Sequence, residues 1–284
     1  PRPFLRKLTA MRPSPLAGLR VLDLTRLLPG PLASMHLADL GADVIKIEDT
    51  GAGDYARSAG AVHGAVSYFQ LVNRNKRSLR LDLKQAAGVD AFMRLATSAD
   101  VILEGFRPGV VDKLGIGYAA VAAINPRIAY CAITGYGQDG PYRDRAGHDL
   151  NYLGYCGLLD QIGTAGGAPA IPNFQIGDLL GGSLSALVGV LAAVIDARAT
   201  GHGRYVDVSM TDAVFAHTLF PLLAVLGLGH AVPRGEDVLS GGMPSYGVYA
   251  TSDGRHLAVS AMEPKFWQTL CTAIGRPDLA PFAF

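Results

Sequence analysis

The sequence lacks the short motifs that mark the commonest chemistries of α/β proteins. No GxGxxG follows the first predicted strand, and no GxxxxGK[ST], HExxH or GxSxG occurs anywhere in the chain. These absences argue against a classical dinucleotide site, a P-loop, a zincin-type metal site and a hydrolase nucleophile elbow. The seven histidines are scattered, with no pair at metal-ligand spacing. We therefore predict that the protein uses no metal and no redox cofactor.

An excess of charge of one sign is also absent, and cysteine is scarce. Lys and Arg total 25 against 24 Asp and Glu, so bulk charge predicts neither a nucleic-acid nor a membrane-surface partner. The three cysteines form no CxxC, and their odd number fits a reducing, cytoplasmic compartment, or mitochondria or peroxisomes in a eukaryote. No run of about 18 uninterrupted apolar residues occurs, so we predict no membrane span.

Alternating strand and helix patterns fill most of the chain. Residues 19–25 and 43–48 are apolar enough for buried strands, and a helical pattern between them ends at Gly41, which predicts a βαβ unit. Further strands are predicted at 78–83, 100–106 and 128–137, and further helices at 85–99 and 118–127. The repeated alternation predicts an α/β fold with a doubly wound parallel sheet, and ligands at the carboxyl ends of its strands.

The composition changes once along the chain, which predicts two domains. Residues 16–226 form the predicted large domain, and residues 227–247, rich in glycine and proline, form a linker. A hairpin pattern and a helix in residues 248–284 predict the start of a smaller α+β domain. Residues 1–15 are interpreted as an extension or expression remnant, and because the sequence stops just after a helical pattern we expect a fragment.

Basic residues lie beside several predicted strand ends. The candidates are Arg26, Arg74, Lys76, Arg77 and Arg107. Cations at such positions can clamp phosphate groups, and arginine can do so through two parallel hydrogen bonds. Solvated loop charges are the alternative interpretation.

Asp178 lies where a long apolar helix is predicted to begin. The aspartate could simply cap this helix, or it could be a functional carboxylate stabilised by the helix dipole. Gly181 and Gly182 leave the first turn without side chains. Because glycine costs about 1 kcal/mol in a helix interior, these two predict either close approach of a substrate or close helix packing.

The stretch "RDRAGHDLNYLG", residues 143–154, places His148 at the junction between a loop and an apolar helix, followed by Asp149. Histidine is the side chain best suited to move a proton near neutral pH, although many loop histidines are merely exposed. Glu263 precedes Pro264 at another predicted helix start, where an acidic residue is favoured by the dipole alone.

Taken together, these segments resemble the family III coenzyme A (CoA) transferases, of the CaiB/BaiF type. The resemblance runs from about Leu16 to at least Trp267 and is carried by "LAGLRVLDLTRLLPGPLASMHLADLGADVIKIE", "NRNKRSLRLDL", "VILEGFRPGVVDKLGIGY" and "GYGQDGPYRDRAGHDLNYL". "AGHDLNYLG" and "AMEPKF" are similar to the α-methylacyl-CoA racemase branch, whose motif histidine is catalytic and paired with the glutamate. The transferring branch uses the aspartate of its GD motif as a nucleophile and lacks the histidine.

The resemblance implies a Rossmann-like large domain, a smaller domain and an interlocked homodimer with its active site between the two domains. It implies that His148 and Asp178 exchange protons on opposite faces of the α-carbon of an acyl-CoA thioester. Glu263 would orient His148, Asp149 would assist, and backbone N–H groups near Asp178 would hold the enolate. CoA is part of the substrate, so no cofactor is expected.

The five basic residues are the predicted ligands of the CoA phosphates. The predicted acyl pocket is lined by Gly181, Gly182, Tyr152, Met243 and Tyr246, with Met210 as a further candidate. Core packing is the alternative for each aromatic or methionine in this set. Two other functions remain open: CoA transfer through an anhydride on Asp178, and CoA binding without catalysis.

Overall fold

A six-stranded parallel sheet forms the centre of the larger structural unit. The computed structural model describes residues 13–58 and 67–283. The strands are β1 (Arg20–Asp23), β2 (Asp43–Glu48), β3 (Arg77–Arg80), β4 (Val101–Glu104), β5 (Ala129–Thr134) and β6 (Arg204–Ser209). Their order is β3-β2-β1-β4-β5-β6, so the winding reverses between β1 and β4. The predicted α/β class is confirmed, and the reversal is where such sheets bind ligands.

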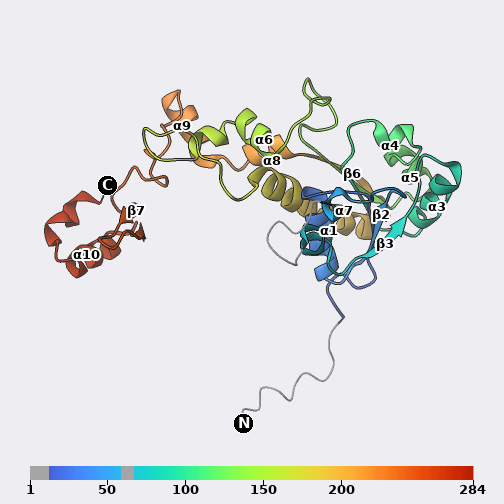
Figure 1. The fold of residues 1–284 in the computed structure, drawn as a ribbon, viewed down its shortest axis with the longest axis horizontal. Coiled ribbons are helices and arrows are strands. Elements are labelled where there is room, and N and C mark those ends of the chain that lie inside the picture. The colour runs from blue at the N-terminus through green and yellow to red at the C-terminus, as the bar shows by residue number, and fades with distance from the viewer. Residues whose placement is uncertain (1–12, 59–66, 284) are drawn as a thin grey trace, which may run out of the picture. The chain divides into compact units, whose positions relative to one another are not determined.

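Helices cover both faces of this sheet (Figure 1). They are α1 (Pro29–Asp39), α2 (Tyr68–Asn73), α3 (Ala86–Ala96), α4 (Val110–Lys113), α5 (Tyr118–Ile124) and α7 (Ser185–Thr200). Val21 belongs to a core cluster with residues of α1 and α7, whereas its neighbour Leu22 belongs to a cluster with residues of α3 and α5. Successive strand residues point to opposite faces, and burial of both faces explains why the strands read as continuous apolar runs.

One helical stretch, Gly177–Thr200, is long and apolar enough to cross a membrane by length and composition. The sequence predicted a long apolar helix here but no membrane span. The stretch begins as a π-helix, η4 (Gly177–Leu184), and continues as α7, which contacts β5, β6 and α1. Ala186, Val190 and Ala193 are buried in those contacts. A helix with one face packed on a sheet belongs to the core of the unit.

The contacts divide the chain at other points than the composition does. The first unit comprises the chain up to Tyr152 together with Gln175–Val214, and the second comprises Leu153–Phe174 and Phe215–Phe284. The predicted large-domain boundary at residue 226 therefore lies inside the second unit, within α9 (Leu219–Leu228). Glycine and proline mark turns, whereas a domain boundary is set by contacts that composition does not record.

The second unit contains the predicted hairpin and helix. Strands β7 (Tyr246–Ala250) and β8 (His256–Ser260) pair antiparallel, and α10 (Pro264–Ala273) follows. Trp267 and Cys271 of α10 form a small core with Ala261 and Ala283. The remaining elements are η2 (Tyr55–Arg57), α6 (Asp149–Tyr155), η3 (Leu158–Gln161), α8 (Met210–Phe215) and η5 (Pro277–Phe282), of which η2, α6 and α8 begin in the first unit.

Candidate active site

His148 lies at the start of α6, and hydrogen bonds hold its backbone on both sides. Its N–H donates to Asn151 Oδ1 at 2.9 Å, and its carbonyl accepts from the N–H groups of Asn151 and Tyr152. The Tyr152 hydroxyl donates to the carbonyl of Gly147 at 2.6 Å. Asn151 thus supplies the reciprocal half of a capping box, which fixes the backbone while the His148 side chain stays exposed.

A cavity of about 320 Å³ lies beside His148, at the carboxyl ends of β1, β4 and β5. This is the point where the winding of the sheet reverses, as predicted for a ligand site. The predicted site residues in its wall are Arg26, Arg107, His148, Tyr152 and Met210. A histidine and two of the predicted phosphate ligands, far apart in sequence, therefore share one cavity.

Asp149 connects the histidine to the second catalytic candidate. Its Oδ1 accepts the backbone N–H of Asp178 at 3.1 Å. The pKa of the Asp178 carboxyl is raised to about 6, chiefly by burial and in addition by the negative charge of Asp149, while His148 acts in the opposite direction. A carboxyl with this pKa is present in both protonation states near neutral pH. The backbone N–H of Asp178 already has an acceptor, so the structure removes it from the predicted enolate donors.

The turn that carries Asp178 is a π-helix, a conformation often found at functional sites. A Cβ on Gly181 would lie 2.6 Å from the Met210 carbonyl, and one on Gly182 would lie 2.6 Å from Pro29 Cβ. Neither glycine is part of the cavity wall. The structure therefore gives these glycines a packing role instead of the predicted contact with substrate. They let the π-helix approach α8 and the start of α1.

Three predicted phosphate ligands are engaged elsewhere. Lys76 is buried, and its Nζ donates to Asp23 Oδ2 at 3.0 Å, Pro31 O at 2.8 Å and Asn73 Oδ1 at 2.7 Å. All three of its N–H donors are used, so it has none left for a ligand.

Arg77 begins β3 and pairs with Asp43 at the start of β2, with Nη2 2.6 Å from Oδ1. Arg74 pairs with Asp39 at the end of α1, with Nε 3.1 Å from Oδ1. The starts of parallel strands lie at the edge opposite the ligand edge. Arg74, Lys76 and Arg77 are therefore removed from the candidate phosphate ligands. The sequence shows that a basic residue lies near a strand, but it does not show at which edge of the sheet the residue lies or whether its side chain is buried.

Two arginines that the sequence interpretation did not choose also line the cavity. Arg143 and Arg145 precede His148 in the same loop. The guanidinium of Arg145 lies over the ring of Tyr142, 4.6 Å from its centroid. Their position in the same stretch as the candidate histidine is the sequence signal that could have identified them.

A second cavity of about 620 Å³ lies at the carboxyl ends of β2 and β3. Its wall includes Asp49, Tyr55 and Lys84, and it shares Arg26 and Phe106 with the first cavity. The Arg26 guanidinium donates to the Tyr55 hydroxyl at 3.1 Å and lies 3.1 Å from Asp49 Oδ2. Arg26 therefore stands at the boundary between two cavities.

The remaining predicted site residues belong to the second unit. Glu263 is exposed and caps α10, and its carbonyl accepts from the N–H groups of Phe266 and Trp267. Tyr246 lines a cavity of about 560 Å³ and forms a β-bridge with Met243. The predicted pairing of Glu263 with His148 and the predicted contact of Met243 and Tyr246 with substrate stay predictions.

The chain is similar to known proteins over most of its length. The chain is 38% identical over 262 residues to human alpha-methylacyl-CoA racemase, covering 92% of this chain and 65% of that protein. It is 37% identical over 267 residues to mouse succinyl-CoA:glutarate CoA-transferase, covering 93% of this chain and 61% of that protein. The chain thus spans less than two thirds of the length of either relative, and the two identities do not separate the two activities.

The fold itself matches a solved structure. A CAIB/BAIF family protein from Brucella suis superposes with a TM-score of 0.82 at 33% identity, over 95% of this chain and 72% of that one. A family model described as CoA-transferase family III matches residues 16–283. The chain therefore belongs to CoA-transferase family III.

Proposed function

We propose that this chain carries the proton-transfer site of an α-methylacyl-CoA racemase, an isomerase that inverts the methyl-bearing carbon beside the thioester. The observation that supports this proposal most strongly is that Asp149, the residue after His148, binds the backbone N–H of Asp178 and so holds the two candidates near one another. His148 borders the cavity, and it influences the Asp178 carboxyl, whose pKa burial raises to about 6. The raised pKa lets the Asp178 carboxyl hold a proton near neutral pH, and histidine is the residue type best suited to exchange protons there.

The mechanism follows from the acidity of the carbon beside a thioester. The carbonyl accepts charge as an enolate while neutral His148 removes the proton from one face. Protonated Asp178 then delivers a proton to the opposite face, and the reverse reaction exchanges the two roles. Each direction requires one proton on the pair, and each group typically contributes about 10²–10⁴-fold to the rate.

The two cavities that share Arg26 suit the two ends of an acyl-CoA. We propose that the nucleotide lies in the cavity at the ends of β2 and β3, with Arg26 and Arg107 facing the phosphates and the thioester beside His148. Guanidinium groups bind phosphate oxygens through paired hydrogen bonds. CoA belongs to the substrate, so the reaction as proposed needs no cofactor. Glu263 is proposed to orient His148.

CoA transfer is the second candidate, favoured by the similarity to the succinyl-CoA:glutarate transferase. Asp178 would then act as an ionised nucleophile. The two functions predict different pH dependences. Transfer should rise through about pH 6 and level off, because only the carboxylate of Asp178 attacks. Racemisation should fall on both sides of an optimum, because it needs the singly protonated pair.

The decisive test is deuterium exchange with a single enantiomer of a 2-methylacyl-CoA in D₂O, followed by NMR. We expect exchange of the α-proton with loss of optical purity, and at least about 100-fold slower exchange in His148→Ala and in Asp178→Ala. His202→Ala, which removes an exposed histidine just before β6, is the matched control and should keep the wild-type rate. No exchange, together with CoA transfer to an added carboxylic acid, would contradict the racemase and support the transferase.

A further inference from the structure

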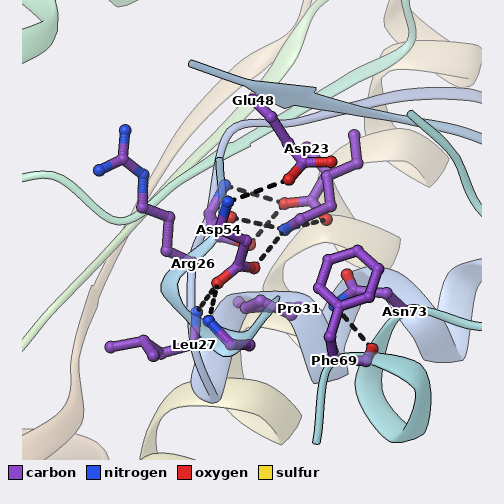
Figure 2. A network of polar contacts seen from close by, with 12 residues as sticks. Asp23, Arg26, Leu27, Pro31, Glu48, Asp54, Phe69 and Asn73 are labelled. Atoms are coloured by element: carbon purple, nitrogen blue, oxygen red, sulfur yellow. Dashed lines mark hydrogen bonds and ion pairs between the residues drawn. The ribbon is translucent and has the colours of Figure 1, made fainter. Parts of the chain in front are cut away.

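A buried ion cluster lies beside the turn that follows β1 (Figure 2). Lys46 of β2 is 1% exposed, and its Nζ lies 2.8 Å from Asp54 Oδ2 and 4.0 Å from Asp23 Oδ2. Lys76 contacts Asp23 from another side at 3.0 Å. Two ammonium groups thus balance two carboxylates. Desolvation offsets most of the attraction in such a cluster, so net stability is a weak reason for its presence.

The cluster holds the backbone on both sides of Arg26. Lys46 Nζ donates to the carbonyl of Thr25 at 2.8 Å, and Asp23 Oδ1 accepts the N–H of Thr25 at 2.9 Å. Beyond Arg26, Asp54 Oδ1 accepts the N–H of Leu27 at 3.0 Å. Every one of these bonds ends on a charged side chain of the cluster, so the cluster fixes the course of the turn.

The turn needs this support because Leu27 is strained. Its φ is +60°, in the left-handed region. That conformation costs a non-glycine residue about 1–2 kcal/mol and persists only where the surroundings enforce it. The bond from Leu27 N–H to Asp54 is one such restraint. Without the cluster, the turn would relax and Arg26 would move with it.

The side chain of Arg26 points away from the cluster (Figure 2) and lines both of the cavities described above. Asp54 caps η2 by accepting the N–H of Ala56 at 2.9 Å, and η2 carries Tyr55, whose hydroxyl accepts from Arg26. Asp54 therefore helps to place both the backbone beside Arg26 and Tyr55, the hydrogen-bond partner of the Arg26 guanidinium.

The same turn also reaches the helix of Asp178. Ser183 Oγ is 2.7 Å from the carbonyl of Pro29, which follows the turn, and 3.2 Å from the carbonyl of Asp178. A displacement of the turn would therefore be transmitted through Pro29 and Ser183 to the π-helix that carries Asp178.

We propose that Lys46 and Asp54 are positioning residues that set the Thr25–Leu27 turn so that Arg26 binds the diphosphate of CoA at the boundary between the two cavities. For its ligand, this inference rests on the proposed function. Lys46 and Asp54 act through Arg26 and do not touch CoA. They therefore affect the affinity for CoA and KM more than kcat.

A double-mutant cycle tests this proposal on the full chain, with CoA as the probe in calorimetry. Lys46→Met combined with Asp54→Asn removes both charges of the pair. We expect it to weaken CoA binding about tenfold, as Arg26→Ala does, since each loses about one charge-assisted hydrogen bond. In the Arg26→Ala background the paired change should weaken CoA binding by less than about twofold more, because the paired change and Arg26→Ala act through the same contact. Asp54→Asn alone serves if the paired variant does not fold.

The control removes an ion pair of another part of the sheet. Arg204→Met with Asp196→Asn separates a 2.7 Å pair between β6 and α7 and should leave the affinity for CoA unchanged. If the wild type binds CoA, but the variants lose affinity in a fully additive way or lose none, the positioning role is overturned and the proposed function stands. A wild type that neither binds CoA nor exchanges the α-proton would overturn both.

Discussion

At the scale of single residues, the protonation of Asp178 depends on its neighbour Asp149. Asp149→Asn removes the charge that helps to raise the pKa of Asp178, while the amide oxygen can still accept the Asp178 N–H. We expect the pKa of Asp178 to fall below about 6 and the exchange rate at neutral pH to fall by up to about tenfold, because fewer carboxyls hold a proton. The pH–rate profile of α-proton exchange measures this.

Asp144 offers the matched control for Asp149. Its side chain is 82% exposed in the same loop. Asp144→Asn should leave the acidic limb of the pH–rate profile of α-proton exchange unchanged. An identical profile for Asp149→Asn and the wild type would show that the charge of Asp149 does not govern Asp178.

Glu104, at the end of β4, predicts a pH-dependent stability. Burial raises its pKa from 4.5 to about 7, although its Oε2 accepts the N–H of Phe106 at 2.7 Å. A carboxyl whose pKa rises on folding binds its proton more tightly in the folded state. The free energy of unfolding therefore falls as pH rises from about 4.5 to about 7, and stays lower above that.

Glu104→Gln should remove this loss of stability at higher pH. We expect the variant to exceed the wild type in free energy of unfolding by on the order of 1–3 kcal/mol at pH 8, with little difference near pH 4.5. Urea unfolding at both values measures it. A difference that is the same at both pH values would contradict the assignment to Glu104.

At the scale of elements, the approach of the π-helix to α1 depends on Gly182. A methyl group there would lie 2.6 Å from Pro29 Cβ and 3.1 Å from Met210 Sδ, so the helix must shift. We expect Gly182→Ala to lower the free energy of unfolding by about 1–3 kcal/mol. Gly154→Ala in α6 meets nothing within 4 Å and should instead raise it by up to about 1 kcal/mol. Equal effects in urea unfolding would contradict the packing role.

The elements also show how far local pattern predicts structure. Strands β1 to β5 and the helices α1, α3, α5, α7 and α10 overlap the segments where the sequence pattern predicts them. The short helices α2 and α4 were missed, because one or two turns carry too little periodicity to be recognised. α9 was also missed, since its apolar residues show no helical period that separates two faces.

At the scale of the whole molecule, α9 predicts self-association. Leu219, Leu223 and Leu226 are 67%, 66% and 77% exposed, and none of the residues of α9 is buried. Exposed apolar patches of this kind usually mark contact surfaces. We propose a homodimer and expect the combined Leu223→Glu and Leu226→Glu substitutions to yield monomers in sedimentation velocity. Lys113→Glu on α4 should not change the sedimentation coefficient, and a wild type that is monomeric at every concentration would contradict the proposal.

The sequence by itself determined the α/β class, most of the elements, and the candidates His148 and Asp178. These features depend on residues that are near neighbours in the chain, so periodicity, turn residues and motif resemblance record them. Arg26 and Arg107 line the first cavity, because both follow strands at their carboxyl ends, and their contact with phosphate stays a prediction.

Only the tertiary structure decided which basic residues reach the cavity and which are buried. Lys76 and Arg77 follow Arg74 in one basic stretch. Lys76 nevertheless neutralises Asp23 inside the core, whereas Arg77 pairs with Asp43 at the opposite edge of the sheet. The cluster of Lys46 and Asp54 around the turn of Arg26 was likewise not predicted from the sequence. The environment of a charge depends on strands that are distant in sequence, and parallel pairing brings these together only in the folded chain.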